Sequence, residues 1–199
     1  SVSTLIENTL TYKKIFKKHD INAVVGNSYQ NLYYEMIAAE KKNLVKVGDH
    51  YYDVIDAGTT DPNAWGNIGE SALLSYFGRL NYSFDEKYLV SATFRSDGSS
   101  KFAKGNKWGF FPSVSAGWRI SKENFFHVNG ISDLKLRFSH GTLGNANIGN
   151  WDYSAILNSF PIAVFGNNQH LNTGMTQIKL VNQDLKWEKK TQKNSQNNM

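Results

Sequence analysis

The segment "SYFGRLNYSFDEKYLVSATFRSDGSS", residues 75–100, decides the fold because apolar and polar side chains alternate along most of it. Successive side chains of a β-strand point to opposite faces, so this alternation predicts strands with one apolar and one polar face. Two such strands, 73–84 and 87–97, flank a short turn at Asp85 and Glu86. The polar face collects Arg79, Asn81, Ser83, Ser91, Thr93, Arg95 and Asp97.

The same pattern recurs along the chain and predicts an all-β fold. Further strands are predicted at 9–17, 20–31, 108–120 and 132–141. Residues 32–70 are predicted to be long and irregular, with a possible short helix over 32–44. Because successive strands are joined by turns and loops, we expect them to pair as an antiparallel meander.

The connections alternate between short and long. The connections 17–20, 85–86 and 121–131 are short or moderate, whereas 32–70, 98–107 and 142–183 are long. Alternate connections of a meander lie at the same end, so all the long loops are expected on one side. Short turns at one end and long loops at the other are typical of outer-membrane β-barrels, whose strands need about 9–11 residues to cross the hydrocarbon.

Composition excludes several classes of protein and site. The 199 residues contain no run of 18 apolar residues, so no membrane-spanning helix is predicted. The absence of cysteine excludes a disulfide scaffold, a thiolate zinc site and a cysteine nucleophile. The net charge is +5, but the lysines are scattered or lie in short turns, which favours solvated turns over nucleic-acid binding.

Alternation alone leaves two architectures open. In a membrane barrel the apolar face meets lipid and the polar face lines a wet lumen. In a soluble β-sandwich, here a carbohydrate-binding module, the apolar face is buried between two sheets. The sandwich predicts a shared buried core; the barrel predicts the same side chains exposed on one surface. The residues that distinguish the two are Leu80, Val90, Val114 and Leu136.

Four segments resemble the barrel of SusC/RagA-type TonB-dependent outer-membrane transporters. They are "KYLVSATFRSDGSSKF", "WGFFPSVSAGWRIS", "LKLRFSHGTLGNANIG" and "DLKWEKKTQ", which occur in this order between residues 87 and 192. The resemblance implies a barrel of 22 strands with an N-terminal plug, of which residues 1–199 match a middle portion of about six to seven strands. The plug and the TonB-contacting segment are expected to lie outside this portion, and the polar tail 189–199 departs from the family's alternating pattern.

The same resemblance implies a function. A fragment of a TonB-dependent importer is expected in the bacterial outer membrane, in contact with lipid. It would carry glycans, oligosaccharides or peptides with a SusD-like lid lipoprotein and the TonB complex. No cofactor is implied, and no enzyme is expected. The S-x-x-K pattern at Ser132 and Lys135 lies in a predicted strand rather than on the helix that this chemistry needs.

Metal ligation is not predicted either. The five histidines are far apart and show no ligand spacing. Asp53, Asp56 and Asp61 could bind Ca²⁺ in a loop, but ordinary loop acids explain them better.

Two sets of residues are candidates for transport. The predicted lumen-facing charges could contact the plug or line the solute path, although they could also simply hydrate the lumen; they are Arg79, Arg95, Asp97, Arg119, Lys135 and Arg137. The predicted loop aromatics could stack on sugar rings or pack against a lid protein, although they could also pack against their own loops; they are Tyr51, Tyr52, Trp65, Trp151 and Tyr153.

Overall fold

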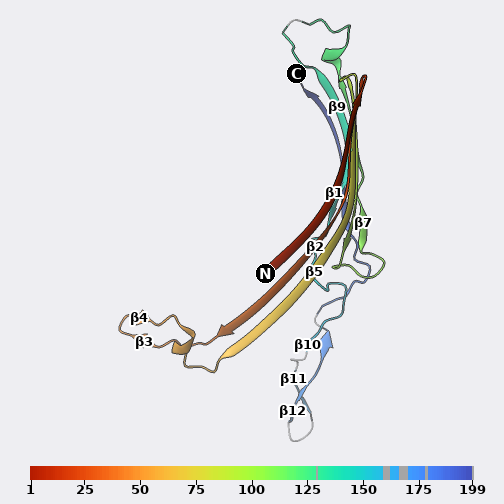
Figure 1. Cartoon of the computed structure of the whole chain (residues 1–199). Coiled ribbons are helices and arrows are strands. Elements are labelled where there is room, and N and C mark those ends of the chain that lie inside the picture. Colours follow the sequence, from red (N-terminus) through yellow and green to blue (C-terminus); the bar gives the residue numbers. More distant parts are fainter. Residues whose placement is uncertain (129, 159–161, 166–169, 178, 199) are drawn as a thin grey trace.

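The computed structural model describes residues 1–128, 130–158, 162–165, 170–177 and 179–198, and its main feature is one curved antiparallel sheet (Figure 1). The strands pair in the order β1-β2-β5-β6-β8-β9-β14, with the short β7 paired to β6. Their bounds are β1 Val2–Phe16, β2 His19–Glu40, β5 Asn63–Phe84, β6 Tyr88–Ser99, β7 Trp108–Phe110, β8 Ser113–Arg119, β9 Lys135–Asn145 and β14 Glu188–Asn198.

Several short elements lie in the connections between the strands of the main sheet. Within the described residues, three two-stranded sheets pair separately from the main sheet, and two short 3-10 turns lie in the connections 41–62 and 120–134. The strands are β3 Lys46–Val47, β4 His50–Tyr51, β10 Leu157–Asn158, β11 Ile162–Phe165, β12 His170–Thr173 and β13 Thr176–Gln177, and the turns are η1 Ile55–Ala57 and η2 Ile120–Lys122. Among the described residues, no helix is long and apolar enough to cross a membrane.

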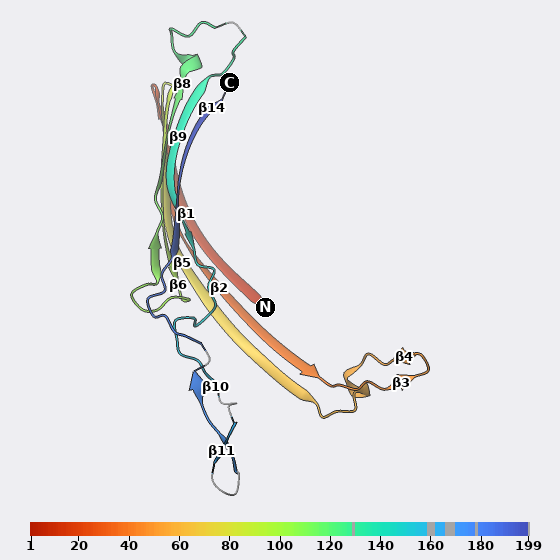
Figure 2. The same ribbon diagram turned by 180° about the vertical axis from the view of Figure 1, so that it is seen from behind.

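The sheet confirms the predicted meander and the asymmetry of its ends. Every strand of the main path pairs antiparallel with the next strand along that path. The connections 41–62, 100–112 and 146–187 share the lower end of Figure 1, whereas the short turns and the connection 120–134 share the upper end. Figure 2 shows the same division from behind, so the long loops lie on one side as expected.

One local prediction was wrong. The segment 32–44 is not a helix: β2 runs through to Glu40 and pairs with β5 as far as Asn63. This distant pairing outweighs the local helix preference. The polar tail 189–199 nevertheless contributes a strand, because residues 188–198 form β14 and pair with β9. Backbone hydrogen bonds hold that strand, and they do not require an alternating side-chain pattern.

The soluble sandwich is excluded by the exposure of the apolar face. Leu80 is 47% exposed, Val90 44%, Val114 47% and Leu136 39%, and no second sheet of the described chain covers them. The only buried apolar side chains among the described residues are Phe102 and Phe111, which lie at the long-loop end. The architecture is therefore a single-layer wall, without a core between two layers.

Candidate functional site

The register of the sheet sorts side chains onto two faces, because directly opposed residues of an antiparallel pair share a face. One row across four strands joins Tyr82, Val90, Ala116 and Phe138. The next row toward the long loops contains Leu80, Ala92 and Val114. These rows define the apolar face.

Aromatic residues border this apolar face at both ends. Phe84, Tyr88 and Trp118 form one register row at the short-turn end. Toward the long loops, Tyr76 stacks on Trp108 with ring centroids 6.0 Å apart. An apolar band between two aromatic girdles is the lipid-facing pattern of outer-membrane barrels.

The polar face lies on the other side of the same strands. A continuous row crosses seven strands and consists only of residues with amine, amide or hydroxyl groups: Lys13, Asn22, Asn81, Ser91, Ser115, Ser139 and Asn194. The register places all six predicted charged residues on this face: Arg79, Arg95, Asp97, Arg119, Lys135 and Arg137. Their assignment to a lumen stays a prediction.

A polar hollow of about 790 Å³ brings four of these six residues together: Arg79, Arg95, Asp97 and Arg137. Small hydroxyl side chains form part of its lining, among them Ser91, Thr93, Ser113, Ser115 and Ser139, and Phe111, Val114 and Leu143 line it as well. Arg119 and Lys135 lie nearer the short-turn end, and Lys135 lines a second hollow of about 380 Å³. We call the larger cavity the polar hollow.

Two of the charged residues form a fixed pair. Arg95 Nε donates to Asp97 Oδ2 at 2.8 Å, and the same guanidinium donates to Ser75 Oγ at 3.0 Å. The guanidinium also lies 5.9 Å from the ring centroid of Phe77. Arg79 donates to the hydroxyl of Thr93 at 3.2 Å. The polar hollow therefore combines a rigid Arg–Asp pair with a less constrained arginine.

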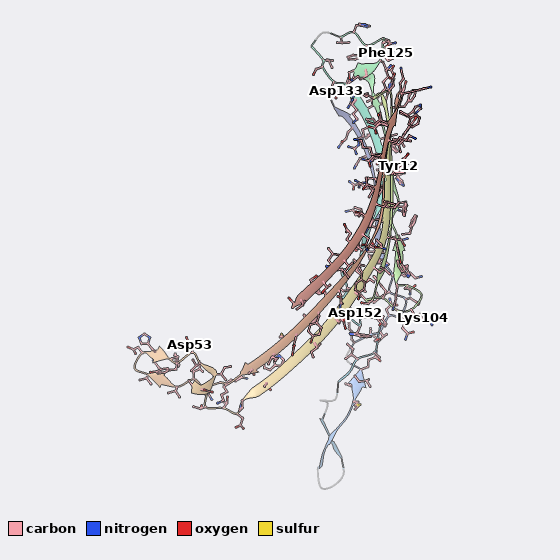
Figure 3. The ribbon with its side chains drawn as sticks, in the orientation of Figure 1. Tyr12, Asp53, Lys104, Phe125, Asp133 and Asp152 are labelled. Carbon is pink, nitrogen blue, oxygen red and sulfur yellow. The ribbon has the colours of Figure 1, made fainter. Side chains whose placement is uncertain are left out.

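The predicted loop aromatics do not converge on one site. Trp151 and Tyr153 pack together with centroids 6.0 Å apart. Tyr51 lies on the β3–β4 hairpin, with Lys46 Nζ 5.6 Å from its ring centroid, and Tyr52 follows it. Figure 3 shows these two regions far apart, marked by Asp152 and Asp53. Trp65 was wrongly predicted in a loop, because β5 begins at Asn63 and includes it.

Sequence reasoning missed an aromatic cluster that joins two long loops. Trp187 packs against Phe102 and Phe111, with ring centroids 5.2 Å and 5.3 Å away. Its Nε1 donates to the backbone oxygen of Lys107 at 2.9 Å. Only the aromatic residues in the segments "SSKF", "GFFP" and "LKWE" hinted at it, because the partners are far apart in sequence.

A second missed feature lies at the short-turn end. Glu123 Oε1 accepts hydrogen bonds from Trp118 Nε1 at 2.9 Å and from Tyr88 Oη at 2.8 Å. Lys87 Nζ lies 3.1 Å from Glu123 Oε2. These hydrogen bonds, that from Trp118 foremost, hold the pKa of Glu123 below its usual value. Glu123 thus ties two girdle aromatics to the connection outside the sheet.

No metal centre emerges from the described ranges, where no three His, Cys, Asp or Glu side chains are grouped to hold an ion. The arrangement instead offers a two-faced wall, apolar on one side and charged on the other.

Comparison with known proteins shows which family this chain matches. Residues 5–194 match the family described as "TonB dependent receptor-like, beta-barrel". The chain is 37% identical over 189 residues to TonB-dependent receptor P3 of Formosa agariphila, covering 94% of this chain and 18% of that protein. It is 45% identical over 127 residues to TonB-dependent receptor SusC of Bacteroides thetaiotaomicron, covering 61% of this chain and 12% of that protein.

A solved structure shares the fold. The RagAB peptide importer in its closed-closed state superposes with a TM-score of 0.78 at 30% identity, covering 97% of this chain and 21% of the matched chain. The chain thus spans about a fifth of the length of these relatives.

Proposed function

Because this chain belongs to the TonB-dependent receptor-like β-barrel family of bacterial outer-membrane proteins, we propose that it forms part of the wall of a nutrient importer. Members of this family are transporters rather than enzymes. We therefore expect the polar hollow to bind a solute or to let it pass, and not to catalyse a reaction. The transported solute is a large nutrient, an oligosaccharide or a peptide.

One observation carries the proposal: the sheet exposes its apolar face and places its charges on the opposite face. Phe94 is 47% exposed on the apolar side, whereas the next residue, Arg95, lies on the polar side with 44% of its side chain exposed. A soluble protein would be destabilised by an uncovered apolar wall, and a bilayer covers it. The apolar face therefore meets lipid and the polar face meets the water path.

The names of two relatives support the partners that we propose. One relative is named TonB-dependent receptor SusC, and the matched solved structure is the RagAB peptide importer. We infer that a SusD-like lipoprotein lies over the long-loop end and that TonB acts through a plug. The loops that would receive the lipoprotein are 41–62 and 146–187, which share one end of the sheet.

Orientation is tested with single cysteines, because these 199 residues contain none and any cysteine elsewhere in the full-length protein is first replaced by serine. In the full-length barrel protein that carries this segment, Val90→Cys and Ser91→Cys place a thiol on opposite faces of one strand. A bimane label at position 90 is expected to be quenched by brominated lipid, and a label at position 91 by aqueous iodide. The reverse pattern, or quenching of both labels by iodide alone, would overturn the proposed wall.

Transport is tested by deleting the gene. When the deletion strain is grown on a panel of oligosaccharides and peptides, growth on at least one of them is expected to fail. Growth on the corresponding monosaccharide or free amino acids is expected to continue. Unchanged growth on every large nutrient tested would contradict the importer function.

A further inference from the structure

The connection that follows β8 folds back against the end of the sheet. Trp118 is held from two sides: its Nε1 donates to Glu123 Oε1 at 2.9 Å, and its ring meets Phe125 edge-on with centroids 6.4 Å apart. The same oxygen of Glu123 accepts from Tyr88 Oη at 2.8 Å. Residues 123–125 therefore have a fixed position against β6 and β8. Figure 3 shows Phe125 at the short-turn end, far from Lys104 at the other end.

Phe125 lies on the outward side of the sheet. Its partner Trp118 belongs to the outward register row of Phe84, Tyr88 and Trp118. The ring of Phe125 extends this row beyond the strands, and the residue is 68% exposed. The neighbouring strands of this row are part of the described sheet, and a plug occupies the inside of a barrel rather than its outer side. The exposure of Phe125 is thus a property of the outer surface.

The row that Phe125 extends lies at the edge of the apolar band. Phe84 in this row and Tyr76 in the opposite girdle are eight residues apart on β5. At roughly 3.3 Å per residue they are about 26 Å apart along the strand, or about 20 Å across the membrane at a tilt of about 40°. An outer-membrane barrel has an apolar band about 25 Å tall. The two girdles therefore mark the two membrane interfaces, and Phe125 is beside one of them.

Charged groups border Phe125 on the water side. Glu123 pairs with Lys87, whose Nζ lies 3.1 Å from Oε2. Lys122 pairs with Glu86 of the neighbouring turn at 2.8 Å, and their side chains are 50% and 72% exposed. An exposed aromatic ring between an apolar band and hydrated ion pairs matches the interfacial zone of a bilayer, where aromatic side chains are enriched.

We propose that the connection after β8 carries a membrane anchor, in which Phe125 enters the phospholipid leaflet at the short-turn end beside Trp118. Glu123 is the positioning residue, because it holds Trp118 and Tyr88 and precedes Phe125 by only two residues. Lipid is the occupant, since the ring continues an aromatic row that a bilayer already contacts. This inference rests on the proposed wall and adds to it a lipid contact made outside the strands.

The test measures the depth of a bimane label in the full-length barrel, reconstituted in lipid nanodiscs so that both ends meet water. A label on Phe125→Cys is expected to be quenched more by lipid brominated near the glycerol backbone than by lipid brominated near the chain ends. A label on Val90→Cys, within the apolar band, is expected to show the reverse order. A label on Lys122→Cys is the matched control and is expected to be quenched by aqueous iodide, because its exposed ion pair contributes little to stability.

Two further variants test the positioning residue. Glu123→Ala removes the acceptor for Trp118 and Tyr88, so the label at position 125 is expected to lose lipid quenching and to gain iodide quenching. Glu86→Ala removes an acid from the neighbouring turn without touching Trp118, and is expected to leave the label unchanged. Heat-modifiable migration on a gel confirms that each variant is folded before it is read.

Two results would overturn the anchor: iodide quenching at position 125 as strong as at position 122, or quenching by neither reagent, which would mean that protein covers the ring. Equal effects of Glu123→Ala and Glu86→Ala would overturn the role of Glu123. The labels at positions 90 and 91 are read in the same nanodiscs. If they report the expected faces while position 125 meets water, the anchor is wrong and the proposed wall stands. If they fail, the wall itself is wrong.

Discussion

Arginine at two paired positions of the apolar face offers the sharpest test of the wall. Val90 and Ala116 are direct partners of β6 and β8, in the row between the two aromatic girdles. Val90 is 44% exposed, so an arginine there has room and no packing clash explains a loss. The cost on the lipid face at the bilayer midplane is about 2–4 kcal/mol for each arginine. Each change should therefore shift the folding equilibrium roughly 30- to 700-fold.

The two changes together should cost more than either alone, with repulsion between the paired charges added. The matched control is Ser91→Arg with Ser115→Arg, which are also direct partners one step along the same strands but on the polar face. That pair is expected to cost about 1 kcal/mol or less, because the lumen side of a barrel hydrates charge.

The assay is urea titration of the full-length barrel folded into lipid vesicles, followed by tryptophan fluorescence. Heat-modifiable migration on a gel reports the folded fraction independently. Equal destabilisation by the two double variants, or greater loss from the serine pair, would refute the assignment of the apolar face to lipid.

Three other outcomes are expected. Trp187→Ala should speed proteolysis of the loop 100–112, because the variant loses the packing of its ring on Phe102 and Phe111; an unchanged cleavage rate would count against a contact that joins the two loops. The pKa of Glu123 is held below its ordinary value of 4.5, so the ionised carboxylate stabilises the folded state fully above pH 4.5, and this contribution is lost as the pH falls through the lowered pKa. Between pH 5 and 3 the free energy of unfolding should therefore fall more steeply in the parent protein than in Glu123→Gln, and urea titrations at each pH would measure this difference. The 199-residue chain expressed alone should aggregate or oligomerise, because β1 and β14 each present an unpaired edge and each unpaired backbone group in lipid costs several kcal/mol; size-exclusion chromatography in detergent measures this, and a monodisperse heat-resistant monomer would contradict it.

The sequence predicted those parts of the sheet in which two local signals agree, namely the alternation of apolar and polar side chains and the position of the turns. In the segment 73–97, alternation fixed the strands, and the short turn fixed their pairing, which the register of Phe84 with Tyr88 confirms. Once that register was set, the face of every side chain in β5 and β6 followed from the two-residue period. The grouping of Arg79, Arg95 and Asp97 on one face was therefore readable in advance.

Where local signals conflicted with distant partners, the sequence misled. The segment around Met36 favours a helix locally, yet Met36 pairs with Asn67 in a long extension of the sheet. A strand of this kind depends on a partner some thirty residues away, which no local window contains. Trp65 was placed in a loop for the same reason, because the true start of β5 is set by its pairing with β2.

The site was harder to predict than the fold because its decisive contacts are not periodic. That Asp97 uses one oxygen on Arg95 and keeps the other free depends on rotamers, which alternation does not determine. The cluster of Phe102 with Trp187 joins loops far apart in the chain. The alternating pattern shows which residues share a face of the sheet, whereas the contacts that their side chains make can be read only from the three-dimensional structure.

The last strand shows that backbone pairing and side-chain suitability are separate conditions. β14 pairs with β9 along its whole length, so its hydrogen bonding is complete on that side. Yet Lys193 stands opposite His140, on the face where Phe138 and Leu136 lie two and four residues away along β9. A lysine near the midplane carries the same penalty as the arginines considered above. The apolar face therefore ends at β9, and β14 is held in the sheet by its ladder rather than by any affinity of its outward side chains for lipid.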